Sequence, residues 1–433
     1  MANKIAYRGK DSLYLVLYAA LVLAQSILTN TEAAPSMPIR LAYWVLAIYP
    51  AILRPDWMAG VVAMLYTTSS YGFAYGYMPY ENGWYVLFVI AALVVNRNLN
   101  KNNRYPVPGV LAAIMLYTGA IELFTSFSMS SISIIVVLVI LLLKLNLKED
   151  YIAIERLSIG FAVASSVLSV LYVLFGNRFV VTYENMFDRM GWTDPNYFGM
   201  VISFGSITAL FEIVRRRYHY SWEKWLYFYT IAISVPVQIM NGSRGAVLAV
   251  ASSAAVLLLF SRVKMVYKLS IIIVGVFLLY FLYSTTSIYD FLLYRIDNDF
   301  SGSGRIDIWQ VKLSEFLRCD PLQIIFGLGS DAGLTLGWNI EGRSASGIMG
   351  FHSDYIGYLV KYGIIGFILF LALLVTPFKK TAIHKKNFPF VLSGMVAIAL
   401  FAFSLEPYSS GGTAYWLFYM YILMISMNKQ YVV

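Results

Sequence analysis

Arginines and one histidine carry most of the chemistry that this sequence could perform. Arg189, Arg244 and Arg305 stand in polar stretches between apolar runs, and a guanidinium offers a planar, charged fork that binds phosphate bidentately. His352 is followed two residues later by Asp354, and a histidine in this setting can take a proton from a sugar hydroxyl near neutral pH. These residue types predict a site that holds a phosphate or pyrophosphate and activates a hydroxyl group. Further candidate members of the site are Arg178, Asn196, Ser243, Arg343 and Tyr355.

Two of these arginines lie beside expected helix starts. Pro195 suits the first turn of a helix, whose free N–H groups could bind an anion together with Arg189 and Asn196. Arg244 is flanked by glycines and opens a run of small residues, 246–255, that allows close helix packing. Alternatively, each arginine extends to lipid headgroups or pairs with a nearby acid.

A third arginine opens an amphipathic pattern. Arg305 follows a stretch of glycine and serine, and Ile306, Trp309, Leu313 and Phe316 then recur every three or four residues. This spacing predicts a short amphipathic helix on the outer surface of the membrane.

The surrounding sequence gives little support for a metal or a cofactor. We expect Pro321 to end the amphipathic helix and residues 327–329 to form a turn. Asp297 and Asp299 resemble the acidic pair of metal-dependent glycosyltransferases, but no other ligand accompanies them and no metal is assigned. Walker loops and dinucleotide fingerprints do not occur, so we expect no cofactor and no nucleic acid partner.

The composition places these residues in an integral membrane protein. The 433 residues are 59% hydrophobic and only 13% charged, with a mean hydropathy of +0.68, whereas a soluble domain is about 25% charged. The apolar runs do not alternate as the strands of a barrel would. The sequence therefore predicts an all-α, polytopic membrane protein with about 14 transmembrane helices. The expected spans are 12–28, 41–53, 57–75, 83–95, 107–124, 131–143, 157–174, 197–214, 225–240, 246–260, 269–283, 355–375, 388–404 and 413–427.

The basic residues predict how the chain is oriented. They gather in alternate loops, for example at Arg215 and Arg216 or at Lys379 and Lys380, and the positive-inside rule assigns these loops and both termini to the cytoplasm. On the opposite face nearly every cation is an arginine, with Lys312 as the exception.

One polar segment interrupts the pattern of spans. We expect a single transmembrane domain over residues 1–433, in which 284–355 forms a large periplasmic loop. This loop would carry Arg305 and His352 and close as a lid over a vestibule lined with arginine.

In their order along the chain and their expected side of the membrane, these motifs resemble the O-antigen ligase and O-antigen polymerase superfamily of bacterial envelope glycan enzymes. The resemblance covers residues 186–370 and rests on Arg189 with 194–196, 243–245, Gly304-Arg305 with Trp309, 327–329, and His352-Ser353 with Gly363 and Gly366. In the ligases an asparagine usually follows the histidine. Ser353 follows it here, which fits the polymerases at least as well.

The resemblance implies a metal-independent glycosyltransferase of the bacterial inner membrane, with an architecture similar to GT-C-type enzymes. Its donor would be a glycan on a polyprenyl pyrophosphate, and its favoured acceptor another lipid-linked repeat unit. Arg189, Arg244 and Arg305 would hold the pyrophosphate as negative charge grows on it, and His352 would activate the acceptor hydroxyl. A chain-length regulator protein is a further partner that the resemblance admits.

Three other functions compete with a polymerase. An O-antigen ligase would transfer the glycan to lipid A core instead. A flippase or transporter of lipid-linked oligosaccharides should carry charges deep in its spans and repeat its halves, and few mid-span charges occur. A membrane scaffold explains neither the outer arginines nor His352.

Overall fold

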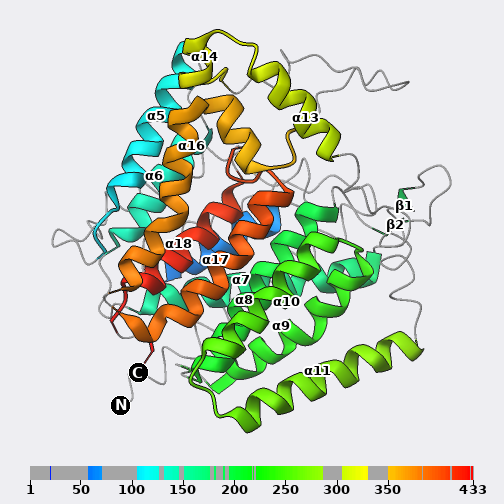
Figure 1. The fold of residues 1–433 in the computed structure, drawn as a ribbon. Coiled ribbons are helices and arrows are strands. Elements are labelled where there is room, and N and C mark those ends of the chain that lie inside the picture. The colour runs from blue at the N-terminus through cyan, green and yellow to red at the C-terminus, as the bar shows by residue number, and fades with distance from the viewer. Residues whose placement is uncertain are drawn as a thin grey trace. The chain divides into compact units, whose positions relative to one another are not determined.

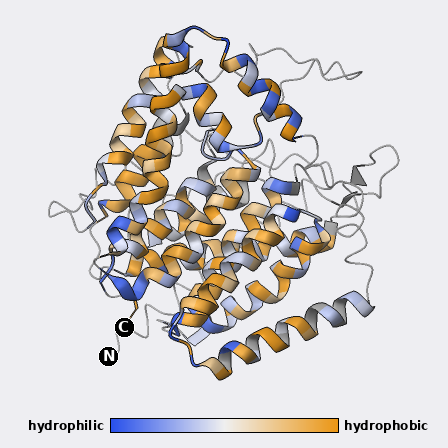
Figure 2. Cartoon of the chain, in the orientation of Figure 1, coloured by the Kyte–Doolittle hydropathy of each residue, from blue (hydrophilic) through white to orange (hydrophobic). Residues whose placement is uncertain are grey.

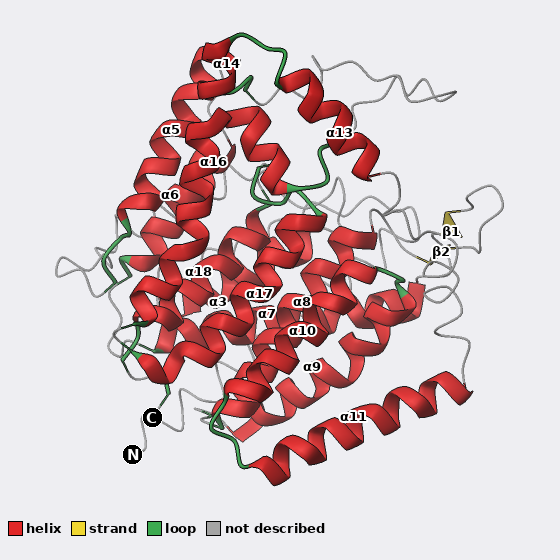
Figure 3. Ribbon diagram, in the orientation of Figure 1, coloured by secondary structure: helices red, strands yellow, loops and turns green. Residues whose placement is uncertain are grey.

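The computed structural model describes a largely helical chain (Figure 3). The described residues are 20, 57–70, 105–125, 131–145, 151–175, 180–181, 189–190, 195–216, 218, 221–285, 305–329, 350–382, 384–409, 412–429 and 431–432. They belong to two compact units. Figure 1 colours the chain by residue number, from blue at the N-terminus to red at the C-terminus. Unit 1 comprises Met1–Lys101, Leu145–Leu292 and Gln430–Val433, and unit 2 comprises Asn102–Lys144 and Leu293–Lys429.

Unit 1 is built around helix α7, which packs against α3, α8 and α9, while α8 also packs against α10. Glycines allow the close approach of α7 to α3, because a Cβ atom on Gly160 would collide with the backbone of Gly60. The elements of unit 1 are α3 (Met58–Ser70), α7 (Ile152–Phe175), β1 (Val180–Val181), β2 (Arg189–Met190), α8 (Pro195–Arg215), α9 (Ser221–Met240), α10 (Arg244–Phe260) and α11 (Met265–Thr285). The two short strands pair antiparallel, with Val181 opposite Arg189.

A buried ionic cluster connects α7, α8 and the segment near Tyr431 at one end of unit 1. Arg215 donates to Glu155 across 2.7 Å and its Nε lies 3.0 Å from Glu212, whose carboxylate also accepts from Ser158 and Tyr431. The Tyr431 ring lies 4.8 Å from the Arg215 guanidinium. The end of the chain near Tyr431 therefore lies beside the α8–α9 connection, which the sequence assigns to the cytoplasmic face.

Unit 2 is built around helix α16, which packs against α5, α14, α17 and α18. Helix α5 packs on α6, and α13 contacts α16. The elements of unit 2 are α5 (Gly109–Thr125), α6 (Ser131–Leu143), α13 (Arg305–Phe316), α14 (Pro321–Phe326), α16 (Asp354–Thr381), the 3-10 turn η3 (Lys385–Asn387), α17 (Phe388–Ser404) and α18 (Thr413–Met427).

Helix α16 is broken at Gly363, whose φ of 65° and ψ of −170° are not helical. A break leaves the preceding carbonyls without helical donors, and other parts of unit 2 supply them. The amide of Leu328 donates to Val360, the amide of Gly329 donates to Lys361, and the Tyr117 hydroxyl donates to Tyr362.

The described helices are mostly hydrophobic along their length, and hydrophilic residues gather at helix ends and connections (Figure 2). Four of them are long and apolar enough to cross a membrane: Ile152–Leu174, Asn196–Arg215, Asp354–Thr381 and Lys385–Ser404. Gly109–Thr125, Arg244–Phe260 and Ala414–Met427 are shorter apolar helices. This arrangement is that of a helical membrane protein.

The expected spans agree with the helices wherever the structure describes the chain. Residues 131–143 and 388–404 match α6 and α17 at both ends, and α7 begins five residues earlier than the span expected at 157. The spans expected at 12–28, 41–53 and 83–95 fall outside the described residues, apart from residue 20.

Candidate functional site

In unit 1 the start of α10 places Arg244 on a tightly packed helix end. Ser243 is the N-cap, and its hydroxyl accepts from the Ala246 amide and donates to Asn196 across 3.2 Å. A Cβ atom on Gly199 of α8 would lie 2.7 Å from the Cβ of Ala246. The predicted helix starts are thus confirmed, and the first turns of α8 and α10 lie side by side with Arg244 beside them.

Other candidates of unit 1 are described only in part. Arg189 lies in strand β2, opposite Val181, and the structure describes its backbone alone. Arg178 lies outside the described residues.

In unit 2 His352 has a left-handed backbone, with φ of 49°. Such a conformation is uncommon for a residue other than glycine and costs about 1–2 kcal/mol, so the surrounding contacts must impose it. The preceding amide, of Phe351, donates to the Glu406 carboxylate, and the amide of Asp354 donates to the Leu405 carbonyl. The backbone is therefore held on both sides of the histidine.

A second carboxylate, that of Asp354, also connects the two segments. The Asp354 carboxylate, at the start of α16, accepts from the amides of Tyr408 and Ser409, at 3.0 and 2.7 Å. Glu406 belongs to the segment after α17 and reaches back to Phe351. The segments 350–354 and 405–409 are thus held together by two carboxylates, those of Glu406 and Asp354, each of which accepts from backbone amides of the other segment. We call this pair of contacts the clamp.

A lysine lies beside the clamp. The Lys361 ammonium donates to the Ser409 carbonyl across 3.2 Å and lies 3.9 Å from the Glu406 carboxylate. All three residues are buried. An ionisable pair buried within an apolar helical unit is expensive to keep there and indicates a functional or positioning role.

Helix α13 is tied to the histidine segment by its tryptophan. The Trp309 indole donates to the Phe351 carbonyl across 2.8 Å, and Arg305 lies one turn earlier on the same side of α13. Lys312, one turn beyond Ile308, is buried, and its ammonium lies 5.9 Å from the centre of the Phe351 ring. Burial lowers the pKa of Lys312 below its ordinary value, although nearby Glu315 opposes the shift.

One expectation about this part of the chain is wrong. Pro321 does not end the amphipathic helix, because α13 ends at Phe316 and Pro321 opens α14, with Asp320 as its N-cap in a capping box. The buried stripe of α13 is Ile308, Lys312 and Phe316, whereas Ile306 is half exposed.

The structure thus assembles the candidate residues in two groups. Asn196, Ser243 and Arg244 lie together in unit 1, and Arg305, His352 and Asp354 belong to the connected part of unit 2. Tyr355 packs edge-to-face on Phe370, with 5.6 Å between ring centres. Arg343 lies outside the described residues, as do Asp297 and Asp299, and within the described residues no three metal-ligating side chains form a group.

Sequence reasoning missed Glu406 and the contacts of Lys361. The available signal was weak: Glu406 is an acid at the end of an apolar run, and Lys361 is a charge inside an expected span. Such intramembrane charges are site candidates by default, but their partners become visible only when 350–361 and 405–409 are seen together.

Comparison with known proteins relates residues 229–371 to a known family. A search of curated proteins found no match. The model of the O-antigen ligase family matches residues 229–371, a segment that contains Arg244, Arg305 and His352. The match indicates glycan transfer of the polymerase or ligase type. It confirms that this chain, over residues 229–371, resembles the O-antigen ligase and polymerase superfamily.

Proposed function

We propose that this protein polymerises lipid-linked oligosaccharide repeat units at the outer face of the bacterial inner membrane. The acceptor sugar hydroxyl attacks the anomeric carbon of the donor glycan, forming the new glycosidic bond. The bond from that carbon to the polyprenyl pyrophosphate breaks, and its electron pair leaves with the pyrophosphate. His352 takes the proton of the attacking hydroxyl.

The observation that carries this proposal is the clamp around His352. A left-handed histidine held by Glu406 on one side and Leu405 on the other is an outlier of the kind that gathers at functional sites. Its attachment to α13 through Trp309 brings the helix that begins with Arg305 into the same part of unit 2. A base and a phosphate-binding arginine are the two groups that this reaction needs.

Arginine side chains would bind the leaving group. Arg189, Arg244 and Arg305 would bind the pyrophosphate, and Asn196 would support them from the first turn of α8. Their contribution is greatest in the transition state, because negative charge develops on the pyrophosphate as the bond breaks. The reaction draws its energy from the donor's own phosphate ester and needs no nucleotide or metal ion.

The acceptor decides between two forms of this reaction. A ligase would use a hydroxyl of lipid A core, and the family match agrees with either acceptor. Ser353 after the histidine favours the polymerase. In a deletion strain, one repeat unit attached to core would identify a polymerase, and polymer that stays on its lipid would identify a ligase.

The test of the base is His352→Ala in that deletion strain, with His384→Ala as a matched control in the basic loop before η3. We expect the His352 variant to lose glycan transfer by about 10²–10⁴-fold while it accumulates normally in the membrane. The control should restore wild-type glycan. Full-length glycan in the His352→Ala strain would contradict the assignment of His352 as the base.

A further inference from the structure

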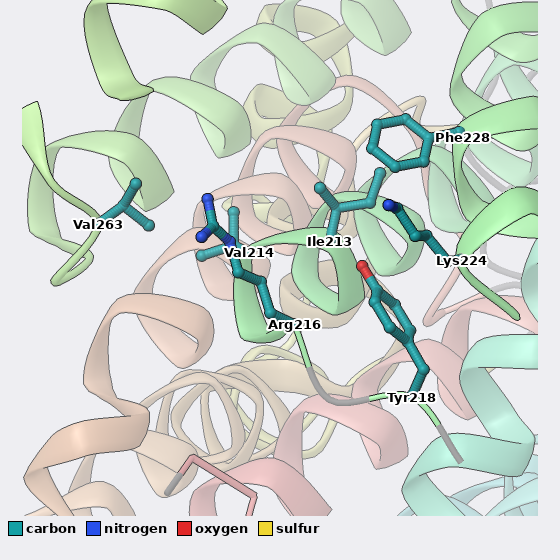
Figure 4. A pocket seen from close by; sticks show the side chains of 7 residues that line it. All are labelled: Ile213, Val214, Arg216, Tyr218, Lys224, Phe228 and Val263. Carbon is teal, nitrogen blue, oxygen red and sulfur yellow. The ribbon is translucent and has the colours of Figure 1, made fainter. Parts of the chain in front are cut away.

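A pocket of about 340 Å³ opens in unit 1 where α8 ends, α9 begins and the α10–α11 connection passes. It lies far along the chain from His352. Asn196 is in the first turn of α8, and the pocket lies at the other end of this helix. Three of its side chains end in polar groups, those of Arg216, Tyr218 and Lys224, and the others are apolar (Figure 4). None of the lining residues is acidic.

The chemistry of the pocket combines positive charge with an apolar wall. Figure 4 shows the Tyr218 hydroxyl and the Lys224 ammonium pointing toward the space beside Ile213, and the Arg216 guanidinium beside Val214. Phe228 and Val263 extend the apolar wall. A small soluble anion would need polar partners on several sides, whereas a molecule with a phosphate and a hydrocarbon chain matches both parts of this lining.

The backbone of Arg216 is an independent sign that its side chain is required here. Arg216 ends α8 with φ of 56°, and its amide donates to the Glu212 carbonyl. Helices that end in this way usually have glycine or asparagine at this position, and another residue there costs about 1–2 kcal/mol. Neighbouring Arg215 pairs with Glu155 and Glu212 in the buried ionic cluster and does not line the pocket.

The surroundings are those of a membrane interface. Trp225 and Tyr229 of α9 are exposed at 70% and 50%, and Met265 and Val266 at the start of α11 are exposed at 65% and 71%. Aromatic and apolar side chains exposed beside basic residues are typical of the level of lipid headgroups.

We propose that this pocket binds an anionic phospholipid of the leaflet that faces the basic loops. The ammonium of Lys224 and the hydroxyl of Tyr218 bind the phosphate, the guanidinium of Arg216 adds positive charge to the same pocket, and an acyl chain lies along Ile213 and Phe228. The lipid joins the end of α8 to the start of α9, and so stabilises the helix that carries Asn196 at its other end. This proposal does not depend on the glycan transfer reaction.

The test uses full-length protein in detergent, freed of lipid and titrated with phosphatidylglycerol, phosphatidylcholine or inorganic phosphate while thermal unfolding is followed. We expect phosphatidylglycerol to raise the melting temperature and the two other probes to leave it unchanged. The variant Arg216→Gly with Lys224→Gln should bind phosphatidylglycerol at least about tenfold more weakly. Glycine suits the backbone of residue 216, so this variant should fold.

The matched control changes two other basic residues of the same unit, Lys264→Gln with Lys268→Gln, which do not line the pocket. It should retain the phosphatidylglycerol affinity of the wild type. An equal loss in both double variants would overturn the proposal in favour of diffuse charge attraction. An equal response to phosphatidylcholine, or to inorganic phosphate, would overturn it as well.

Discussion

A guanidinium and an ammonium carry the same charge but present it differently, and Arg244 is a position where this difference should matter. Arg244→Lys keeps the positive charge and loses the fork that binds two phosphate oxygens at once. We expect glycan transfer to fall at least about tenfold in membranes supplied with lipid-linked donor. Arg262→Lys, in the α10–α11 connection, is the control and should leave transfer unchanged. Wild-type activity of Arg244→Lys would mean that Arg244 only reaches lipid headgroups.

The buried ammonium of Lys312 should make stability depend on pH in an unusual direction. Because burial lowers its pKa in the folded protein, the unfolded chain binds the proton more tightly. Stability therefore rises as the pH increases from this lowered pKa toward the ordinary value of 10.5, and does not change below it. Lys312→Met removes the charge and keeps most of the apolar side chain.

We expect Lys312→Met to melt about 2–4 °C higher than the wild type near pH 7, with a difference that shrinks as the pH approaches 10. Thermal unfolding across this pH range measures both effects. Lys379→Met, at an exposed lysine in the last turn of α16, should show neither. A difference in melting temperature that stays constant with pH would show that the charge of Lys312 does not destabilise the folded protein.

At single residues the sequence predicted chemical types better than contacts. Arg244 at a helix start and His352 before a span follow from local signals, namely the flanking glycines and the next apolar run. The partners of His352 do not, because Glu406 lies more than 50 residues away and its carboxylate is aimed by the fold of unit 2. Asp354, expected near the histidine as a supporting acid, holds the backbone of Tyr408 and Ser409 instead.

Among the elements, the break in α16 explains a glycine whose role the sequence left open. At Gly363 the backbone is left-handed, and a Cβ atom would lie 2.6 Å from the amide nitrogen of Gly327. Gly363→Ala should therefore destabilise unit 2 by about 2–4 kcal/mol, through strain and displacement of 327–329. Thermal unfolding and glycan transfer should both report the loss.

Gly275→Ala is the matched control, because a Cβ atom at this position in α11 would meet no atom within 4 Å. Alanine there should be neutral or stabilise the protein by about 0.5–1 kcal/mol. If the two variants behaved alike, the break at Gly363 would not be required for the fold.

Helices were predictable where one continuous apolar run decides them. The ends of α6 and α17 follow directly from the sequence, since polar residues flank each run. The amides of Leu328 and Gly329 donate to the carbonyls of Val360 and Lys361, just before the break at Gly363, and a pairing between distant segments leaves no periodic trace in either. For the same reason the burial of Lys312 in α13 could not be predicted, because its ammonium lies beside the ring of Phe351, which no local pattern records.

At the scale of the whole molecule, the sequence predicted one transmembrane domain, and the structure divides the chain into two compact units. Arg244 belongs to unit 1, and Arg305 and His352 belong to unit 2. The expectation that the phosphate site draws residues from distant parts of the chain therefore stays a prediction. Composition alone indicated a helical membrane protein, because an apolar chain of this length can satisfy its backbone in lipid only through helices or a closed barrel.

The orientation of the chain in the membrane can be tested on α16 alone. After the break at Gly363, α16 continues to Thr381, and at about 1.5 Å per residue this part extends roughly 27 Å, close to the hydrocarbon core of about 30 Å. The proposed function places the end near His352 outside and the end near Lys379 in the cytoplasm. Single cysteines at Leu317 and Lys379, in a background in which the one natural cysteine, Cys319, is serine, report on the two ends.

We expect a membrane-impermeant maleimide to label Leu317→Cys in intact spheroplasts, because Leu317 follows α13 and is 69% exposed. Lys379→Cys should react only after the membrane is permeabilised. Labelling of both positions in intact spheroplasts would mean that α16 does not cross the membrane. The reverse pattern would place His352 in the cytoplasm, where a flipped, lipid-linked donor is absent, and the proposed reaction could not occur there.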